Sequence, residues 1–159
     1  MKLASRIKFT TAVLVIAACI TSSAQNKSGA TAPDIPKGWF SIPPEKMKWT
    51  KNGDGTLRET AILFGDPTKH ELYGILTKWA PKTTLKAHSH PDDRYIMVLS
   101  GVFYHGYGNK FDATKLERHA TGTMCSEPGN VAHFGGTKDE GAVTYSVGIG
   151  PDRTDPIEK

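Results

Sequence analysis

Histidines are the residues of this 159-residue chain that are best suited to chemistry. The six of them are His70, His88, His90, His105, His119 and His133. His88 and His90 form an H-x-H pair in a strand-like segment, and side chains two residues apart in a strand project from the same face. Two adjacent imidazoles can bind a divalent metal ion if a third ligand arrives from another strand. His133, which follows a Pro-Gly-Asn turn and begins a strand, is the candidate third ligand.

The spacing around these histidines resembles the two sequence motifs of the cupin superfamily. The first motif reads G-x5-H-x-H-x(3,4)-E-x6-G and the second reads G-x5-P-x-G-x2-H-x3-N. Here the two blocks are separated by 20 residues, 102–121. The likeness covers about residues 71–151. The matching positions are His88, His90, Gly101, Gly122, Pro128 and His133.

The resemblance implies a small jelly-roll barrel that encloses one metal ion. In the family, two histidines and a glutamate of the first motif and the histidine of the second hold the metal, which gives His88, His90 and His133 here. Iron, manganese, zinc, nickel and copper all occur. Dioxygenases, decarboxylases, isomerases, lyases and non-catalytic binding proteins share the fold, so the fold does not decide the function. A homodimer that pairs through the outer strands is a further expectation from the resemblance.

The chain departs from the two motifs at four positions. Lys82 replaces the first glycine, and Thr137 replaces the last asparagine. Asn130 replaces the glycine of the second motif, but asparagine also tolerates a positive φ, so the turn can survive. Arg94 replaces the metal-binding glutamate. This last change matters most, because arginine is always charged and offers no lone pair to a metal ion.

Two roles remain open for Arg94. If the strand pattern continues, residue 94 faces the same interior as the two histidines of the first motif. The guanidinium can pair with Asp92 or Asp93, or it can lie beside the metal and bind a carboxylate of the ligand in a bidentate manner. Asp92 or Asp93 can also replace the lost carboxylate. A barrel without metal is a further alternative, because an inward-facing cation opposes metal binding.

Two other side chains are weaker candidates. His105 follows Tyr104 on the next strand and either lines the cavity or faces outward; if it lines the cavity, it is a candidate catalytic residue together with Arg94. Cys125 is interpreted as a small buried apolar residue, because nothing indicates a lowered thiol pKa. The chain contains no Ser-His-Asp arrangement, phosphate-binding loop or CxxC pair.

Short strands must position these residues. β-like runs separated by turn signals cover residues 57–65, 71–79, 84–90, 95–100, 102–108, 121–126, 131–134 and 142–150. Only 111–119 is predicted to be helical, with Asp112 as its cap. The predicted fold is all-β: a single-domain cupin jelly-roll barrel with one short helix.

The N-terminus has the pattern of an export signal. A positively charged start is followed by the apolar run 9–20 and by small residues before Gln25, which predicts cleavage after Ala24 and a periplasmic or secreted protein. Ile-Ala-Ala-Cys ending at Cys19 also resembles a lipoprotein signal, so an anchored lipoprotein is the alternative. The predicted organisation is a signal peptide (1–24), a flexible leader (25–36), an arm or strand packed on the barrel (37–56), the barrel (57–151) and a C-terminal tail (152–159).

The charge of the chain argues against a nucleic-acid partner. The whole chain has a net charge of +4, but the first 24 residues contain three basic and no acidic residues. The remainder has 17 basic and 16 acidic residues, and no basic cluster that could follow a phosphate backbone. The apolar run 9–20 is too short for a comfortable bilayer span, so no transmembrane span is expected in the mature protein.

These observations predict an exported cupin that binds a divalent transition metal through His88, His90 and His133. As an enzyme it would carry out dioxygenase-type chemistry on a small organic molecule that chelates the metal and carries a carboxylate oriented by Arg94. The alternative is a non-catalytic protein that binds or senses a small molecule, with or without a metal.

Overall fold

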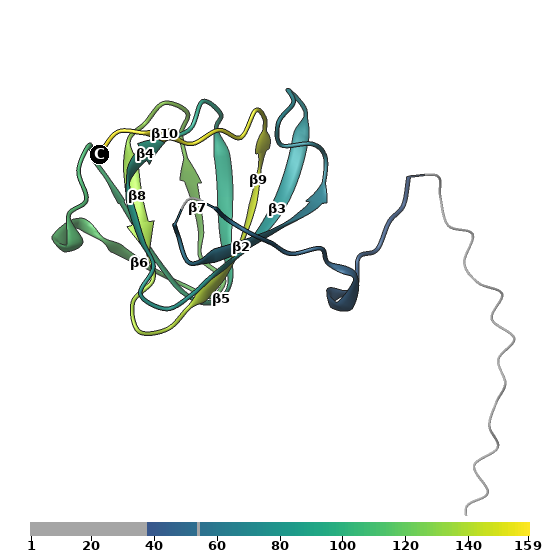
Figure 1. The fold of residues 1–159 in the computed structure, drawn as a ribbon, viewed down its shortest axis with the longest axis horizontal. Coiled ribbons are helices and arrows are strands. Elements are labelled where there is room, and N and C mark those ends of the chain that lie inside the picture. The colour runs from purple at the N-terminus through teal and green to yellow at the C-terminus, as the bar shows by residue number, and fades with distance from the viewer. Residues whose placement is uncertain (1–37, 54) are drawn as a thin grey trace, which may run out of the picture. The chain divides into compact units, whose positions relative to one another are not determined.

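The computed structural model describes residues 38–53 and 55–159, and residues 40–159 form one compact unit (Figure 1). The export signal predicted for 1–24 and the leader predicted for 25–36 lie outside the described residues. None of the helices in the described part of the chain is long and apolar enough to cross a membrane.

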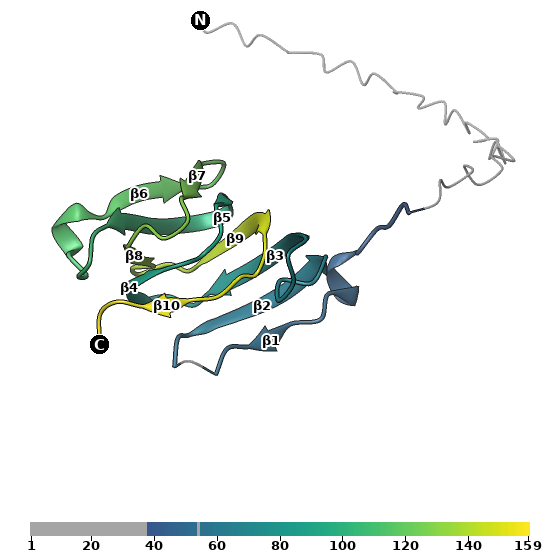
Figure 2. The same ribbon diagram turned by 90° about the horizontal axis from the view of Figure 1, so that it is seen from above.

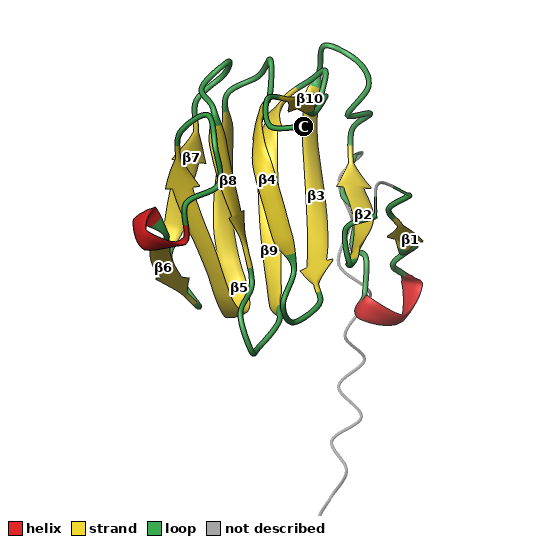
Figure 3. Cartoon of the chain, turned by 60° about the vertical axis from the view of Figure 1, so that its left-hand side comes forward, coloured by secondary structure: helices red, strands yellow, loops and turns green. Residues whose placement is uncertain are grey.

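The unit is built almost entirely of antiparallel strands, which confirms the predicted all-β fold. The strands are β1 (Thr50–Lys51), β2 (Arg58–Phe64), β3 (Leu72–Trp79), β4 (Thr84–Ser89), β5 (Arg94–Tyr107), β6 (Glu117–Ala120), β7 (Met124–Glu127), β8 (His133–Gly136), β9 (Ala142–Ile149) and β10 (Asp155–Pro156). They pair in the order β1-β2-β3-β9-β5-β8-β4-β10, and β6 and β7 also pair with β5. Figures 2 and 3 show this sheet curling round into a barrel.

The long strand β5 joins the two sides of the barrel. Its first half pairs with β9 and β7, and its second half pairs with β8 and β6. The change occurs at Gly101, which has a φ of 73°, just after a bulge between Val98 and Ser100. A side chain at residue 101 would collide with the carbonyl oxygen of Gly141. The motif glycine therefore marks the bend at which one strand passes between two sheets.

The interior holds an apolar core beside the two histidine-containing motifs. Val98, Phe103 and Leu85 pack together with Ala142, and Trp79 lies against them. The rings of Trp79 and Phe103 have centroids 5.1 Å apart. This core fixes the strands that carry the histidines, because side chains in a close-packed interior have little freedom to move.

A β-bulge between β4 and β8 aligns the histidines. Leu85 pairs with Gly135 whereas His88 pairs with His133, so β4 contains one extra residue in this interval. Without the bulge, residues 85 and 88 would face opposite sides of the sheet. With it, Leu85 and His88 both line the interior cavity.

Two substituted glycine positions of the motifs retain the backbone conformation of glycine. Lys82 has a φ of 60° and Asn130 a φ of 61°. The survival of the turn at Asn130 was predicted, whereas Lys82 keeps the left-handed conformation despite an unfavourable residue type. Thr137, in place of the motif asparagine, accepts a hydrogen bond from the backbone N–H of Thr83 over 3.0 Å and closes the adjacent turn.

Two segments outside the main strands differ from expectation. The helix predicted over 111–119 is wrong: only the 3-10 turn η2 (Ala113–Lys115) forms, and β6 follows it. Asp112 does cap this turn, accepting a hydrogen bond from the N–H of Thr114 over 2.9 Å. Residues 152–159, expected to be a tail, include β10, which pairs with β4.

The segment 40–53 packs against β2 and β3. It contains the 3-10 turn η1 (Pro44–Lys46) and β1, which pairs with β2. The rings of Phe40 and Phe64 lie 6.2 Å apart, and Lys78 places its Nζ 3.7 Å from the ring centre of Trp49. These contacts hold the segment against the barrel wall.

The left-handed residue Lys82 predicts a stabilising substitution. Lys82→Gly should raise the free energy of unfolding by about 1 kcal/mol, because a non-glycine residue in this conformation costs roughly that amount. Urea denaturation measures the change. As a control, Thr84→Gly at the exposed start of β4, ahead of the bulge, should lower the stability by about 0.5–1 kcal/mol. A Lys82→Gly protein that is no more stable than wild type would contradict the argument.

Candidate metal centre

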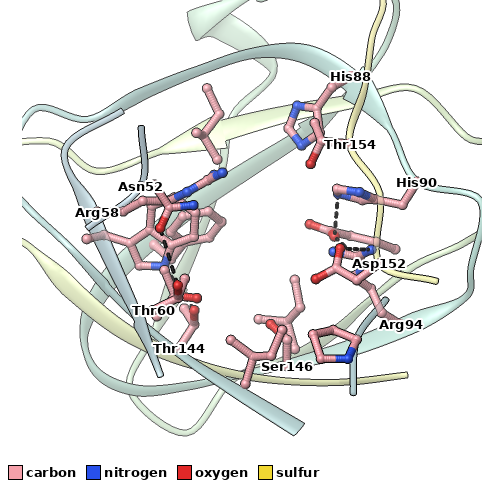
Figure 4. A pocket seen from close by; sticks show the side chains of 18 of the residues that line it. Asn52, Arg58, Thr60, His88, His90, Arg94, Thr144, Ser146, Asp152 and Thr154 are labelled. Carbon is pink, nitrogen blue, oxygen red and sulfur yellow. Dashed lines mark hydrogen bonds and ion pairs between the residues drawn. The ribbon is translucent and has the colours of Figure 1, made fainter. Parts of the chain in front are cut away.

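The barrel encloses a cavity of about 270 Å³ whose two walls differ in chemistry. Figure 4 shows His88, His90, Arg94 and Asp152 on one wall. The facing wall carries Asn52, Arg58, Thr60, Thr144 and Ser146. A water molecule occupies about 30 Å³ in the liquid, so the cavity has room for a ligand of on the order of ten non-hydrogen atoms.

The three predicted histidines come together, and two of them, His88 and His90, line this cavity. His88 lies on β4, His90 follows this strand, and His133 begins β8 as the cross-strand partner of His88. The ring centroids of His88 and His133 are 4.5 Å apart, and that of His90 lies 5.0 Å from each of the others. The rings of His88 and His90 therefore lie on one face, as the two-residue repeat of a strand predicts.

Backbone carbonyl groups fix the protonation pattern of all three rings. The Nδ1 atoms of His88, His90 and His133 lie 2.7, 2.9 and 3.0 Å from the carbonyl oxygens of residues 86, 153 and 131. A carbonyl oxygen can only accept, so each Nδ1 carries the proton and each Nε2 keeps its lone pair. Histidines that bind metals are commonly oriented by this kind of hydrogen bond. The buried Nε2 of His133 has no hydrogen-bond partner in the structure.

Glu127, at the end of β7, adds a carboxylate that the sequence analysis missed. Its side chain is buried, with Oε2 3.5 Å from Nε2 of His133 and 3.7 Å from Nε2 of His90. Oε1 lies 3.3 Å from Nε2 of His105. Side chains of β7 alternate between exposed and buried, so Cys125 and Glu127 share the inner face. This alternation within the second motif was the sequence feature that could have identified Glu127.

Arg94 faces the interior but is held by two aspartates. Its Nη2 donates to Oδ1 of Asp92 over 2.7 Å and to Oδ1 of Asp152 over 2.8 Å. Tyr73 donates its hydroxyl proton to the other carboxylate oxygen of Asp92 over 2.7 Å. The pairing with Asp92 is thus observed, yet the side chain is only 7% exposed and remains on the cavity wall. Asp93 takes no part, since it accepts a hydrogen bond from the N–H of Gly129.

His105 also points into the barrel rather than outward. It is 4% exposed, and its ring centroid lies 5.3 Å from that of His133. Its close polar neighbour is Glu127. The structure therefore places His105 next to the carboxylate of the site.

The interior environment changes the pKa values of these groups. Burial lowers the pKa of His133 to about 4 and lowers the pKa values of His88 and His90 in the same direction. Burial alone would raise the pKa of Glu127, but the approach of His105 and the positive charge that the neighbouring imidazoles carry when protonated outweigh burial and lower the pKa to about 2. Burial also raises the pKa of the Cys125 thiol to about 11, which agrees with an inert role.

The donor set suits one transition-metal ion. The candidate ligand atoms of His88, His90 and His133 all lie within 4.8 Å of one another, and those of His105, Glu127 and His133 do so too. Two atoms each about 2.1 Å from one ion are roughly 3.0–4.2 Å apart, depending on the angle between them. The separations of Glu127 Oε2 from the His90 and His133 nitrogens fall in this range. Imidazole and carboxylate ligands suit iron, manganese, zinc, nickel and copper.

Comparisons with known proteins bear on the fold. No protein-family model matches the chain, and no curated protein sequence matches it. Among solved structures, the polyketide cyclase RemF from Streptomyces resistomycificus is similar with a TM-score of 0.62 and 14% identity over 76% of this chain and 87% of that one. An RmlC-like cupin from Shewanella frigidimarina gives 0.56 and 18% identity over 72% and 91%.

Two further similar structures are matched over a smaller share of their own chains. A DMSP lyase structure has a TM-score of 0.57 and 18% identity over 70% of this chain, which spans 63% of that lyase chain. The iron(II) form of HppE has a TM-score of 0.55 and 17% identity over 73% of this chain and 63% of that one. Similarity at this level of identity establishes the architecture and leaves the reaction open. The chain has the cupin jelly-roll fold.

Proposed function

We propose that this chain is a metal-dependent cupin in which the Nε2 atoms of His88, His90 and His133 bind one divalent transition metal at the wall of the cavity. The observation that carries the proposal is the shared hydrogen-bond pattern of the three rings. Each Nδ1 donates to a carbonyl oxygen, so each Nε2 keeps its lone pair, and the candidate ligand atoms of the three rings lie within 4.8 Å of one another. We also propose that the chain is exported, because its N-terminus has a basic start, the apolar run 9–20 and small residues before Gln25.

The cavity beside the ligands makes an enzyme on a small organic molecule the function that fits best. A bound divalent metal would act as a Lewis acid toward an oxygen of such a ligand. The residues of the chain would orient the ligand through the hydroxyl groups of Thr60, Thr144 and Ser146, which line the facing wall. Dioxygenase-type chemistry needs a redox-active metal such as iron, so the identity of the metal decides between oxygen chemistry and purely Lewis-acid chemistry.

The metal content of the purified full chain tests this proposal. We expect about one transition-metal ion per chain by elemental analysis, and at least a tenfold loss in His88→Ala and His133→Ala. His70→Ala serves as a matched control, because His70 is exposed and outside the cluster, and it should retain the wild-type content. A wild-type protein that holds no transition metal after reconstitution would sink the proposal, and bound zinc in place of iron would exclude dioxygenase chemistry.

The buried neutral imidazoles also predict how pH affects the stability of the metal-stripped chain. The pKa of His133 is about 4 in the folded state and about 6.5 when unfolded. The unfolded chain therefore binds more protons between these values, and stability falls as the pH decreases from 6.5 toward 4. Between pH 7.5 and 5.0, His133 should account for a loss of about 2 kcal/mol.

Urea denaturation after removal of metal measures this dependence. The His133→Gln variant cannot take up that proton, so its free energy of unfolding should change less with pH than that of the wild type. Equal pH dependence in the two proteins would show that His133 is not held neutral by burial.

A further inference from the structure

The position of the cupin glutamate is occupied by Arg94, and Glu127 is its direct neighbour on the next strand. Arg94 of β5 pairs in register with Glu127 of β7. Side chains of directly opposed residues lie on the same face, with Cβ atoms about 5 Å apart. A carboxylate on residue 127 can therefore reach the part of the interior that a carboxylate on residue 94 would occupy.

Two of the atoms nearest Oε2 of Glu127 are hydrogen-bond acceptors. Oε2 lies near the Nε2 atoms of His90 and His133, both of which keep lone pairs because their Nδ1 atoms donate to carbonyl groups. The nearest donor on Arg94, its Nε, is 3.9 Å from Oε2, too far for a hydrogen bond. The buried Nε of Arg94 and Nε2 of His133 are both without a hydrogen-bond partner. A metal ion between Oε2 and the two imidazole Nε2 atoms would satisfy these acceptors together, whereas the Nε–H of Arg94 is a donor.

The charge of Arg94 does not prevent a metal ion from binding here. Asp92 and Asp152 both accept hydrogen bonds from its Nη2. Together with Glu127, these three carboxylates exceed the single positive charge of the guanidinium. The electrostatic objection to a metal beside an inward-facing arginine is therefore removed by its neighbours.

The two aspartates also fix where Arg94 points. With Nη2 held by them, the Nε edge of the guanidinium is directed toward Glu127. On the far side of the carboxylate, His105 approaches Oε1. His105 thus lies beside Oε1, whereas the guanidinium of Arg94 and the imidazoles of the proposed centre lie around Oε2.

We propose that Glu127 is the carboxylate ligand of the metal and that Arg94 is the residue that positions it, so that the ligand has moved from β5 to the facing position on β7. This inference rests on the proposed metal centre of His88, His90 and His133. It replaces the expectation that Arg94 binds a carboxylate of the substrate, because Asp92 and Asp152 already occupy its Nη2.

Binding of Co²⁺ to the metal-stripped full chain tests the role of Glu127. Visible absorption of bound Co²⁺ reports both the affinity and the ligand set. Glu127→Gln keeps the shape of the side chain and removes its charge; it should weaken Co²⁺ binding by 10- to 100-fold and change the spectrum. Glu117→Gln, an exposed glutamate on β6, is the matched control and should behave as wild type.

The role of Arg94 is tested with Arg94→Lys, which keeps the charge but loses the planar fork. We expect several-fold weaker Co²⁺ binding and an altered spectrum, because the carboxylate is less well oriented. A purely structural role would lower the thermal stability of Arg94→Lys and leave the affinity and spectrum unchanged, which would overturn the positioning role.

The double variant Arg94→Glu with Glu127→Gln returns the carboxylate to the position found in the cupin motif. If the protein folds, as judged by its thermal transition, its affinity should recover to within a few-fold of wild type; a folded double variant as weak as Glu127→Gln would contradict the exchange. If it does not fold, the spectra of Glu127→Gln and Arg94→Lys decide.

Wild-type affinity in Glu127→Gln, with binding lost in His88→Ala, would overturn this inference and leave the metal centre standing. No Co²⁺ binding by wild type would overturn both.

Discussion

The interior of this barrel is organised by a group of buried hydrogen-bond acceptors that face one another. Three imidazole lone pairs and the carboxylate of Glu127 meet beside one cavity. Buried polar groups are costly unless a donor or cation meets them, and bringing acceptors together adds electrostatic repulsion. The fold maintains this arrangement through the hydrogen bonds on the opposite edge of each ring. The stability of the fold and the proposed metal binding therefore depend on the same atoms.

The segment after β9 completes the site from the far end of the chain. The carbonyl group of Arg153 orients His90, and the carboxylate of Asp152 helps to hold Arg94. Both residues precede β10, which pairs with β4 directly beside His88 and Ser89. The C-terminal residues are thus joined to the strand that carries the first motif. Loss of this pairing would release the orienting group of one histidine and one of the two anions on Arg94.

Strand periodicity together with the spacing of the two cupin-like motifs predicted that the histidines would lie together, but it did not predict the carboxylate. His88 and His90 are related by the two-residue repeat of a strand, which is a property of neighbouring residues. Glu127 reaches the site through its register with Arg94, which depends on the path of the chain between β5 and β7. Such long-range pairing leaves little trace in local sequence pattern. The bulge before His88 is equally hidden, because it is defined only relative to β8.

The failed helix at 111–119 has a similar physical origin. The segment is too short for helix formation by local propensity alone, since an isolated short helix is marginal in water. Pairing of residues 117–120 with the second half of β5 satisfies the backbone groups of that part in a sheet instead. The local cap at Asp112 was predictable because it involves residues two positions apart, and it persists on the shorter turn.

The engagement of Arg94 changes what the cavity can recognise. Asp92 and Asp152 already hold Nη2 of Arg94. An anionic group of a ligand would instead meet the guanidinium of Arg58 on the facing wall of the cavity. This guanidinium lies over the ring of Trp79, 5.3 Å from the ring centre. Trp79 donates its indole N–H to Thr144, which leaves the hydroxyl proton of Thr144 able to donate to a ligand. Recognition would then depend on the wall opposite the histidines. The groups that would orient a ligand and the groups proposed to bind the metal then lie on different walls. Residues of the ligand-facing wall could therefore be substituted without changing the three histidines and Glu127.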